Sequence, residues 1–201
     1  MTPDRADDWF EQLYASAGED FERIPWAHLA PRPGLVRWLD RNPPAPATPA
    51  LVIACGLGDD AEELARRGCA VEAFDLSPTA IATARRRFPG TQVGYRVADL
   101  FDLPREWRRR FGIVVEVQTV QSIPPDYHRT AIHAIAETVA AHGHVLVRAA
   151  TRAEHEPAPS RPWPLAPSEI AGFADEGLEE LCRRRDGLFV EMDWRRPPDP
   201  G

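Results

Sequence analysis

The sequence predicts an α/β fold: a mostly parallel sheet of seven strands with an antiparallel hairpin at its C-terminal end and helices on both faces. Short apolar runs alternate with helical patterns between residues 50 and 149. A glycine-rich turn follows the first run, and Asp186-Gly187 joins two strand-like segments near the C-terminus. A length of 201 residues fits one domain with a sizeable core.

The N-terminal part is predicted to be helical. Residues 7–17 place apolar side chains at the spacing of an amphipathic helix with acidic residues at its start. A second short helix is expected at 33–40, and the proline-rich residues 42–46 end it. These prolines are interpreted as a stiff connector within the domain, because the part that precedes them is too small to fold alone.

Strands and helices alternate after the connector. Residues 50–54 form a continuous apolar run, typical of a strand that is buried on both faces. Ser77 and Pro78 are typical of the N-cap and first position of a helix. The expected strands are 50–54, 70–74, 92–98, 113–117, 144–149, 178–184 and 188–195, and the expected helices in this part are 59–68, 77–88 and 126–141.

Charge and composition exclude several classes of function. The formal net charge is −7, which argues against a nucleic-acid partner, since phosphates are neutralised by cations. All 24 basic residues other than histidine are arginines. The absence of lysine excludes Schiff-base chemistry and a P-loop, because both need a lysine amine.

Three cysteines without a C-x-x-C spacing indicate a reducing compartment, and six histidines show no metal-binding spacing. No metal is therefore expected. The first residues have no signal-peptide pattern and no apolar run is long enough to span a membrane, so we expect a cytoplasmic protein without a membrane partner. The sequence does not indicate an oligomeric state.

The turn after the first predicted strand carries the main functional signal. Residues 55–61 (CGLGDDA) fit the nucleotide-binding pattern G-x-G-x-x-A, in which glycines let the backbone approach a ligand at a helix N-terminus. Asp75 ends the second strand, 17 residues after Gly58, where an acid can accept hydrogen bonds from ribose hydroxyls. Together these features predict a ligand that contains a nucleoside.

Two carboxylates in the first turn of the next helix bear on the identity of that ligand. Asp59 and Asp60 would repel a pyrophosphate, whereas S-adenosylmethionine has no phosphate and carries a sulfonium cation. The alternative is that both aspartates simply complement the helix dipole.

Three segments resemble the class I S-adenosylmethionine-dependent methyltransferases: residues 52–58, 72–77 and 97–101. The resemblance extends from about residue 49 to the end of the hairpin and implies a Rossmann-like fold. It further implies that Asp75 holds the ribose, that Asp99 binds the adenine amino group, and that apolar neighbours flank the adenine ring. Those neighbours are Leu76, Leu100 and Phe101.

The first segment departs from the family pattern, because Val52 stands where an acid is common and Ala54 where a glycine is common. Glu116 is a candidate replacement for that acid or a contact to the acceptor; the alternative is a carboxylate turned to solvent. The cofactor-binding residues expected from the resemblance are Trp9, Tyr14, Trp26, Ala54, Cys55, Gly56, Gly58, Asp59, Asp75, Leu76, Asp99, Leu100, Phe101, Glu116 and Val117.

The N-terminal region is most similar to the thiopurine and thiol methyltransferase-like branch of that family. Trp9, Tyr14 and Trp26 match aromatic residues that can form a lid over the cofactor, or else they pack in the core. The resemblance implies a single methyltransferase domain over residues 1–201. Residues 1–48 would be a helical lid and connector, and residues 49–201 the cofactor-binding core.

We therefore expect transfer of the methyl group of S-adenosylmethionine to a small molecule, with S-adenosylhomocysteine as the product. No evident base is present, which favours a thiol or another soft acceptor, although His28 or His128 could serve a hydroxyl. The alternatives are an O- or N-methyltransferase of a natural product, an NAD(P)-dependent oxidoreductase, and a non-catalytic cofactor-binding module. Expected acceptor contacts are Trp26, His28, Gln118, Gln121, Tyr127 and Arg152.

Overall fold

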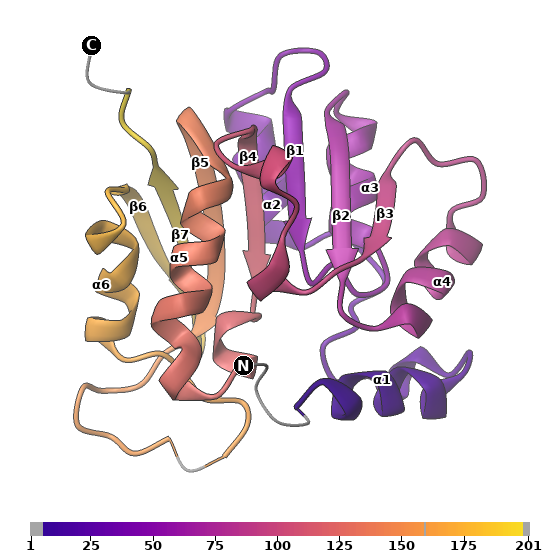
Figure 1. Cartoon of the computed structure of the whole chain (residues 1–201), viewed down its shortest axis with the longest axis horizontal. Helices are drawn as coiled ribbons and strands as arrows, with labels where there is room; N and C mark the ends of the chain where they lie inside the picture. The colour runs from indigo at the N-terminus through magenta and orange to yellow at the C-terminus, as the bar shows by residue number, and fades with distance from the viewer. Residues whose placement is uncertain (1–5, 159, 199–201) are drawn as a thin grey trace. The chain divides into compact units, whose positions relative to one another are not determined.

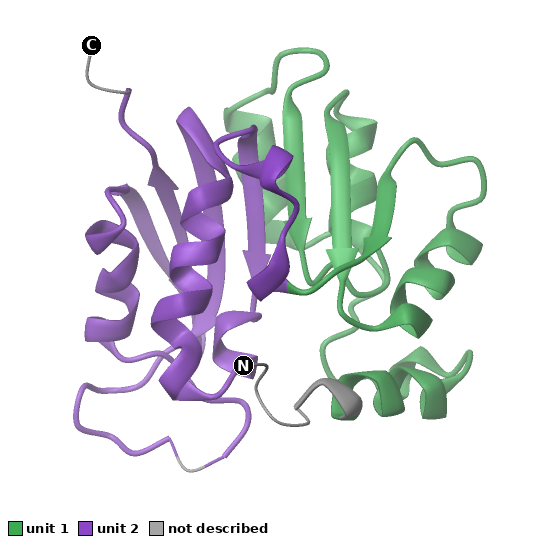
Figure 2. Ribbon diagram, in the orientation of Figure 1, with its two compact units in different colours: residues 1–99 green, residues 100–201 purple. Residues whose placement is uncertain are grey.

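The computed structural model describes residues 6–158 and 160–198. The chain forms two compact units, residues 1–99 and residues 100–201 (Figure 2). The described residues contain seven strands and six α-helices. Among them, no helix is both long enough and apolar enough to cross a bilayer.

The first unit contains three parallel strands in the order β3-β2-β1 (Figure 1). β1 is buried from its second residue onward, as its apolar run predicts, and α4 begins with the Ser77 hydroxyl accepting a hydrogen bond from the Ala80 amide. The elements are α1 (Ala6–Ala17), a 3-10 turn η1 (Phe21–Arg23), α2 (Pro33–Arg41), β1 (Pro49–Ile53), α3 (Asp59–Arg66), β2 (Ala70–Asp75), α4 (Pro78–Arg87) and β3 (Gly94–Val97).

The second unit contains four strands in the order β4-β5-β7-β6, of which β4 and β5 are parallel and the others antiparallel. α5 and α6 pack side by side (Figure 1). The elements are η2 (Leu100–Asp102), η3 (Arg105–Trp107), β4 (Phe111–Val117), η4 (Val120–Ser122), η5 (Pro125–Tyr127), α5 (His128–Thr138), β5 (Val139–Ala150), α6 (Pro167–Asp175), β6 (Glu179–Asp186) and β7 (Phe189–Arg195).

The expected helix at 126–141 is too long. The helix ends at Thr138, and Val139 already belongs to β5 because it pairs with Phe111 at the start of β4. A register shift between Phe111 and Ile113 accommodates this early pairing. Pairing with β4 therefore overrides the helical pattern of the sequence at residues 139–141.

α6 lies in a stretch where no helix is expected from the sequence. Its local signals are present: Pro167 is at the first helical position, Glu169 is at the third, and Ile170 and Phe173 are buried at helical spacing. The Phe173 ring stacks on Trp194 of β7, with ring centroids 5.6 Å apart. This contact fixes α6 on the antiparallel part of the second unit.

Candidate functional site

The turn after β1 is held in a backbone conformation that favours glycine. Gly56 and Gly58 have φ values of +53° and +94°, and Ala54 also has a positive φ of +47°. A Cβ atom on Gly58 would lie 2.3 Å from the Tyr95 hydroxyl oxygen, and one on Gly56 would lie 3.0 Å from the Tyr14 hydroxyl oxygen. The two glycines are therefore required for close packing as well as for φ.

Replacing Gly58 with alanine should lower the free energy of unfolding by about 3 kcal/mol, since it combines an unfavourable φ with overpacking against Tyr95. Gly68→Ala is the matched control, because Gly68 has a φ of +88° and open space around it. That variant should lose only about 1 kcal/mol. Urea denaturation of both variants measures the difference, and equal losses would show that the contact with Tyr95 has no effect.

Asp75, at the end of β2, joins the glycine turn to the start of α4. Its buried carboxylate accepts hydrogen bonds from the Gly56 amide (2.9 Å) and the Ser77 amide (2.9 Å). Burial raises the pKa of Asp75 to about 6, although these amides favour the charged form. The acid expected at the ribose thus lies against the turn and also organises it.

The aromatic residues expected in the lid come together over this turn. Trp26 Nε1 donates a hydrogen bond to the Tyr14 hydroxyl (2.7 Å), and the Trp9 ring lies 5.6 Å from the Trp26 ring. Tyr14 is buried with Leu57 of the glycine turn in one cluster. Burial, followed by the charge of Asp75, raises the pKa of Tyr14 well above its usual value.

Glu11 connects this aromatic segment to the start of α4 through hydrogen bonds that are not predicted from the sequence. Its carboxylate accepts hydrogen bonds from the Ser77 hydroxyl (2.5 Å), the Thr79 amide (3.2 Å) and the Thr79 hydroxyl. Glu11 belongs to α1, so this N-terminal contact of α4 comes from a residue far away in the sequence. Only the tertiary structure reveals the pairing.

The two aspartates at the start of α3 have protein partners. Asp59 forms two hydrogen bonds with the Arg87 guanidinium (2.7 and 2.8 Å), and Asp60 accepts from the Arg32 amide (2.7 Å). Burial raises the pKa of Asp60 to about 6. Arg87 offsets the charge of Asp59, so the expected repulsion of a pyrophosphate depends mainly on Asp60.

The other expected residues of the first unit differ in exposure. Cys55 is half-buried, and burial raises the pKa of its thiol well above the usual value, which fits a packing role. Leu76 and Asp99 are half-buried; Leu76 directly follows β2, and Asp99 comes two residues after the end of β3. His28 is exposed.

In the second unit, Glu116 is fully buried near the end of β4, so the alternative of a carboxylate turned to solvent is wrong. Its Oε1 accepts hydrogen bonds from the Thr119 amide (2.5 Å) and the Val120 amide (3.0 Å). Burial raises the pKa of Glu116 to about 7. Gln118 follows with a φ of +61°, and its amide donates to the Arg148 carbonyl (2.7 Å). Glu116 therefore shapes the turn that holds Val117 and Gln118.

The remaining expected residues of this unit lie near the carboxyl ends of β4 and β5. Gln121 is buried, and its side-chain oxygen accepts from the Ala150 amide (2.5 Å). Phe101, which follows the buried Leu100, has its ring centroid 6.2 Å from that of Tyr127. Carboxyl ends of parallel strands are where α/β proteins bind ligands, so this is a candidate acceptor region.

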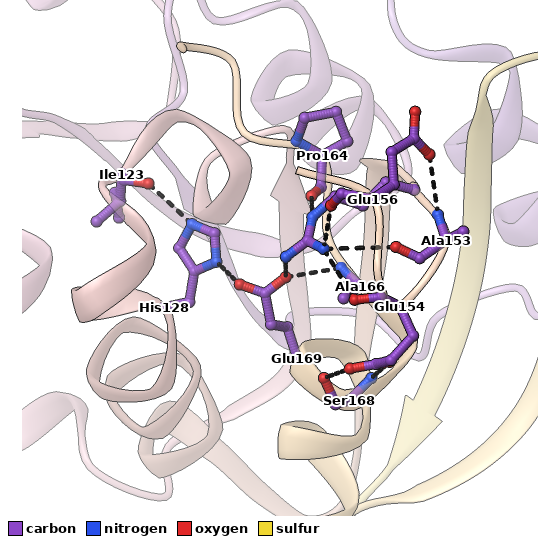
Figure 3. Close-up of polar contacts among 10 residues, drawn as sticks. Ile123, His128, Ala153, Glu154, Glu156, Pro164, Ala166, Ser168 and Glu169 are labelled. Carbon is purple, nitrogen blue, oxygen red and sulfur yellow. Dashed lines mark hydrogen bonds and ion pairs between the residues drawn. The ribbon is translucent and has the colours of Figure 1, made fainter. Parts of the chain in front are cut away.

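His128 is buried, and both of its ring nitrogens have protein partners (Figure 3). Nδ1 lies 2.6 Å from Glu169 Oε1, and Nε2 lies 2.8 Å from the Ile123 carbonyl oxygen. Neither nitrogen is available to a substrate in this arrangement. The geometry favours a positioning role for His128, and leaves His28 as the exposed candidate base.

Residues 50–143 match the family profile described as "Methyltransferase domain". This segment contains the glycine turn, Asp75, Asp99 and Glu116. The matched segment is just under half of the chain, and it is similar to methyltransferase domains. The match supports the enzyme class that the sequence motifs predicted.

The chain is also similar to curated and solved methyltransferases. It is 29% identical over 113 residues to a ubiquinone biosynthesis O-methyltransferase of Azotobacter vinelandii, an alignment that covers 55% of this chain and 48% of that protein. A protein of the same name from Xanthomonas axonopodis pv. citri is 36% identical over 76 residues, or 37% of this chain and 32% of that protein. The chain thus matches less than half the length of these relatives.

Solved structures share the fold. An N-methyltransferase, NodS, from Bradyrhizobium japonicum in complex with S-adenosyl-L-homocysteine has a TM-score of 0.72 at 21% identity, covering 96% of this chain and all of that one. A protein studied for conversion of a disulfide bond into a thioacetal group during echinomycin biosynthesis has a TM-score of 0.79 at 22% identity, covering 96% and 92%. The predicted fold of seven mostly parallel strands with a C-terminal antiparallel pair is confirmed.

The predicted thiopurine and thiol branch is not supported by these matches, because the curated relatives are named O-methyltransferases. Within the residues that the structure describes, no three His, Cys, Asp or Glu side chains are grouped so that they could hold a metal ion.

Proposed function

We propose that this methyltransferase domain binds S-adenosylmethionine at the glycine turn and transfers its methyl group to a small molecule. The observation that carries the proposal is the hydrogen bond that the Gly56 amide donates to the Asp75 carboxylate, within a segment that matches the methyltransferase profile. The glycine turn, Asp75, Leu76 and Asp99 hold the adenosine part. Tyr14 and Trp26 exclude water from the turn, because they pack over it as an aromatic cover.

The chemistry of these residues fits a cationic ligand without phosphate. Asp75 is a buried carboxylate near the turn, and Asp60 is a half-buried one. Arg87, which reaches the turn, is already bound to Asp59 and to the Leu57 carbonyl, so its donors are engaged with protein oxygens. S-adenosylmethionine supplies a methyl group on a positively charged sulfur, and the role of the protein is to align it with the acceptor in a dry site.

The acceptor atom that we propose is a hydroxyl oxygen, on the support of the relatives' names. A hydroxyl needs a base, and His28 is the exposed candidate for that role. A thiol is the second candidate, favoured by the engagement of both His128 nitrogens, because a thiolate needs no base at the moment of transfer. Gln118, Gln121 and Tyr127 are the proposed acceptor contacts.

Calorimetry with S-adenosylhomocysteine, followed by an assay of methyl transfer to phenols, catechols, thiols and amines, tests the proposal. We expect cofactor binding in the micromolar range and turnover of at least one acceptor class. His28→Ala should lower the rate for a hydroxyl and leave the rate for a thiol unchanged. Binding of NADH in place of S-adenosylhomocysteine would contradict the proposal, and binding without any turnover would indicate a cofactor-binding module.

A further inference from the structure

A chain of polar contacts in the second unit joins three elements that are distant in sequence (Figure 3). His128 is the first residue of α5, Glu169 is in the first turn of α6, and Arg152 follows β5. Glu169 accepts from His128 at 2.6 Å through Oε1, and from the Arg152 guanidinium at 3.0 Å through Oε2. The same Oε2 accepts from the Ala166 amide at 2.7 Å. One carboxylate therefore connects both helix starts and the segment after β5.

The protonation of His128 follows from its partners. Nε2 faces the Ile123 carbonyl oxygen, which can only accept, so this nitrogen must carry a proton. Nδ1 faces the Glu169 carboxylate, so a second proton lies between these two groups. The His128 ring thus connects Glu169 to the turn that precedes α5. One of its hydrogen bonds is to the Glu169 carboxylate and the other is to the Ile123 carbonyl, and the bond to the carboxylate is charge-assisted or shares the proton.

Arg152 holds the segment that follows β5, which we call the acceptor loop and which is described at residues 151–158 and 160–166. Its Nε donates to the Pro164 carbonyl (2.9 Å), and its Nη1 donates to the Glu156 carbonyl (2.8 Å). Nη2 reaches Glu169. The guanidinium therefore bonds to both the outgoing and the returning part of the loop, and is engaged with the protein at all three nitrogens.

The returning part of the acceptor loop also contacts an expected acceptor residue. The Trp163 amide donates to the Gln121 carbonyl (2.6 Å), and the Ala150 amide donates to the Gln121 side-chain oxygen (2.5 Å). Gln121 and Trp163 are thereby placed together beside the carboxyl ends of β4 and β5. Any change in the loop should move Trp163 relative to Gln121.

We propose that Arg152, Glu169 and His128 are positioning residues for the methyl acceptor. They hold the acceptor loop so that Trp163, whose amide bonds to the Gln121 carbonyl, offers its aromatic side chain to a flat small molecule. This inference rests on the proposed function. It changes the expected role of Arg152 from direct contact to support, and that of His128 from base to support.

The test is Glu169→Gln, which keeps the shape of the side chain and removes its charge. We expect the KM for the acceptor to rise about tenfold while kcat and the Kd for S-adenosylhomocysteine change less than twofold, since a charge-assisted contact is lost away from the cofactor. Amide hydrogen exchange should increase at residues 151–158 and 160–166. Glu169→Asp, which keeps the charge, should have a KM between those of the wild type and Glu169→Gln.

Glu180→Gln is the matched control, because Glu180 is an exposed carboxylate that pairs with Arg183 on β6 and has no part in these contacts. It should leave KM and hydrogen exchange near wild type. Arg152→Met is a second variant, to be used if Glu169→Gln fails to fold. Equal behaviour of Glu169→Gln and Glu180→Gln, or a parallel loss of cofactor affinity, would overturn the inference. Hydrogen exchange measures the order of the acceptor loop without any turnover, and calorimetry measures cofactor binding independently of the loop. A failure of the positioning proposal can therefore be distinguished from a failure of the proposed function.

Discussion

Asp75→Ala is expected to weaken the binding of S-adenosylhomocysteine at least about 100-fold. The Asp75 carboxylate accepts hydrogen bonds from the Gly56 and Ser77 amides. Its loss leaves these two buried donors without an acceptor at the turn where the cofactor is proposed to bind. Each unsatisfied buried group costs about 1–3 kcal/mol, and 1.4 kcal/mol corresponds to a tenfold change in affinity. Isothermal titration calorimetry measures the change directly.

Asp40→Asn is a suitable control, because Asp40 is an exposed acid that pairs with Arg67. Its cofactor affinity should equal that of the wild type. The pH dependence offers a second reading: the pKa of Asp75 is about 6, so cofactor affinity should fall as pH decreases through 6, when the carboxylate becomes neutral. Unchanged affinity in Asp75→Ala would remove the main support for the proposed cofactor site.

Glu116 is expected to make the protein less stable as pH rises. Burial raises its pKa from 4.5 to about 7, so the folded state binds its proton more tightly than the unfolded state. Stability from this group is fully present below pH 4.5, decreases between pH 4.5 and 7, and is lost above that range. The shift corresponds to about 3 kcal/mol.

Glu116→Gln removes this ionisation. The free energy of unfolding of the variant, relative to that of the wild type, should therefore increase by about 3 kcal/mol between pH 4.5 and pH 8. Urea denaturation at several pH values measures this difference. Glu19→Gln, at an exposed position, should track the wild type across the same range. A constant difference between Glu116→Gln and wild type would mean that Glu116 ionises in the folded protein as it does in the unfolded chain.

Local sequence signals predicted most of the first unit. The apolar run at residues 50–54, the glycine turn and the cap at Ser77 each depend on a few adjacent residues, and the structure contains β1, the turn and α4 accordingly; Ala54 itself is exposed after the end of β1. The same kind of local signal is present at the start of α6, in Pro167 and Glu169. The end of α5 was mispredicted because pairing of Val139 with Phe111 is not encoded near residue 139.

By itself, the sequence determined the alternation of strands and helices, the glycine turn and the acid that follows β2, because backbone sterics and hydrophobic periodicity act over short stretches of chain. The tertiary structure alone decided the roles of the long-range partners. Glu11 reaches Ser77 across 66 residues, and Glu169 reaches His128 across 41. A carboxylate or an imidazole acquires its protonation and its role from whatever the fold places within 3 Å of it, and residue type and spacing do not specify that neighbour.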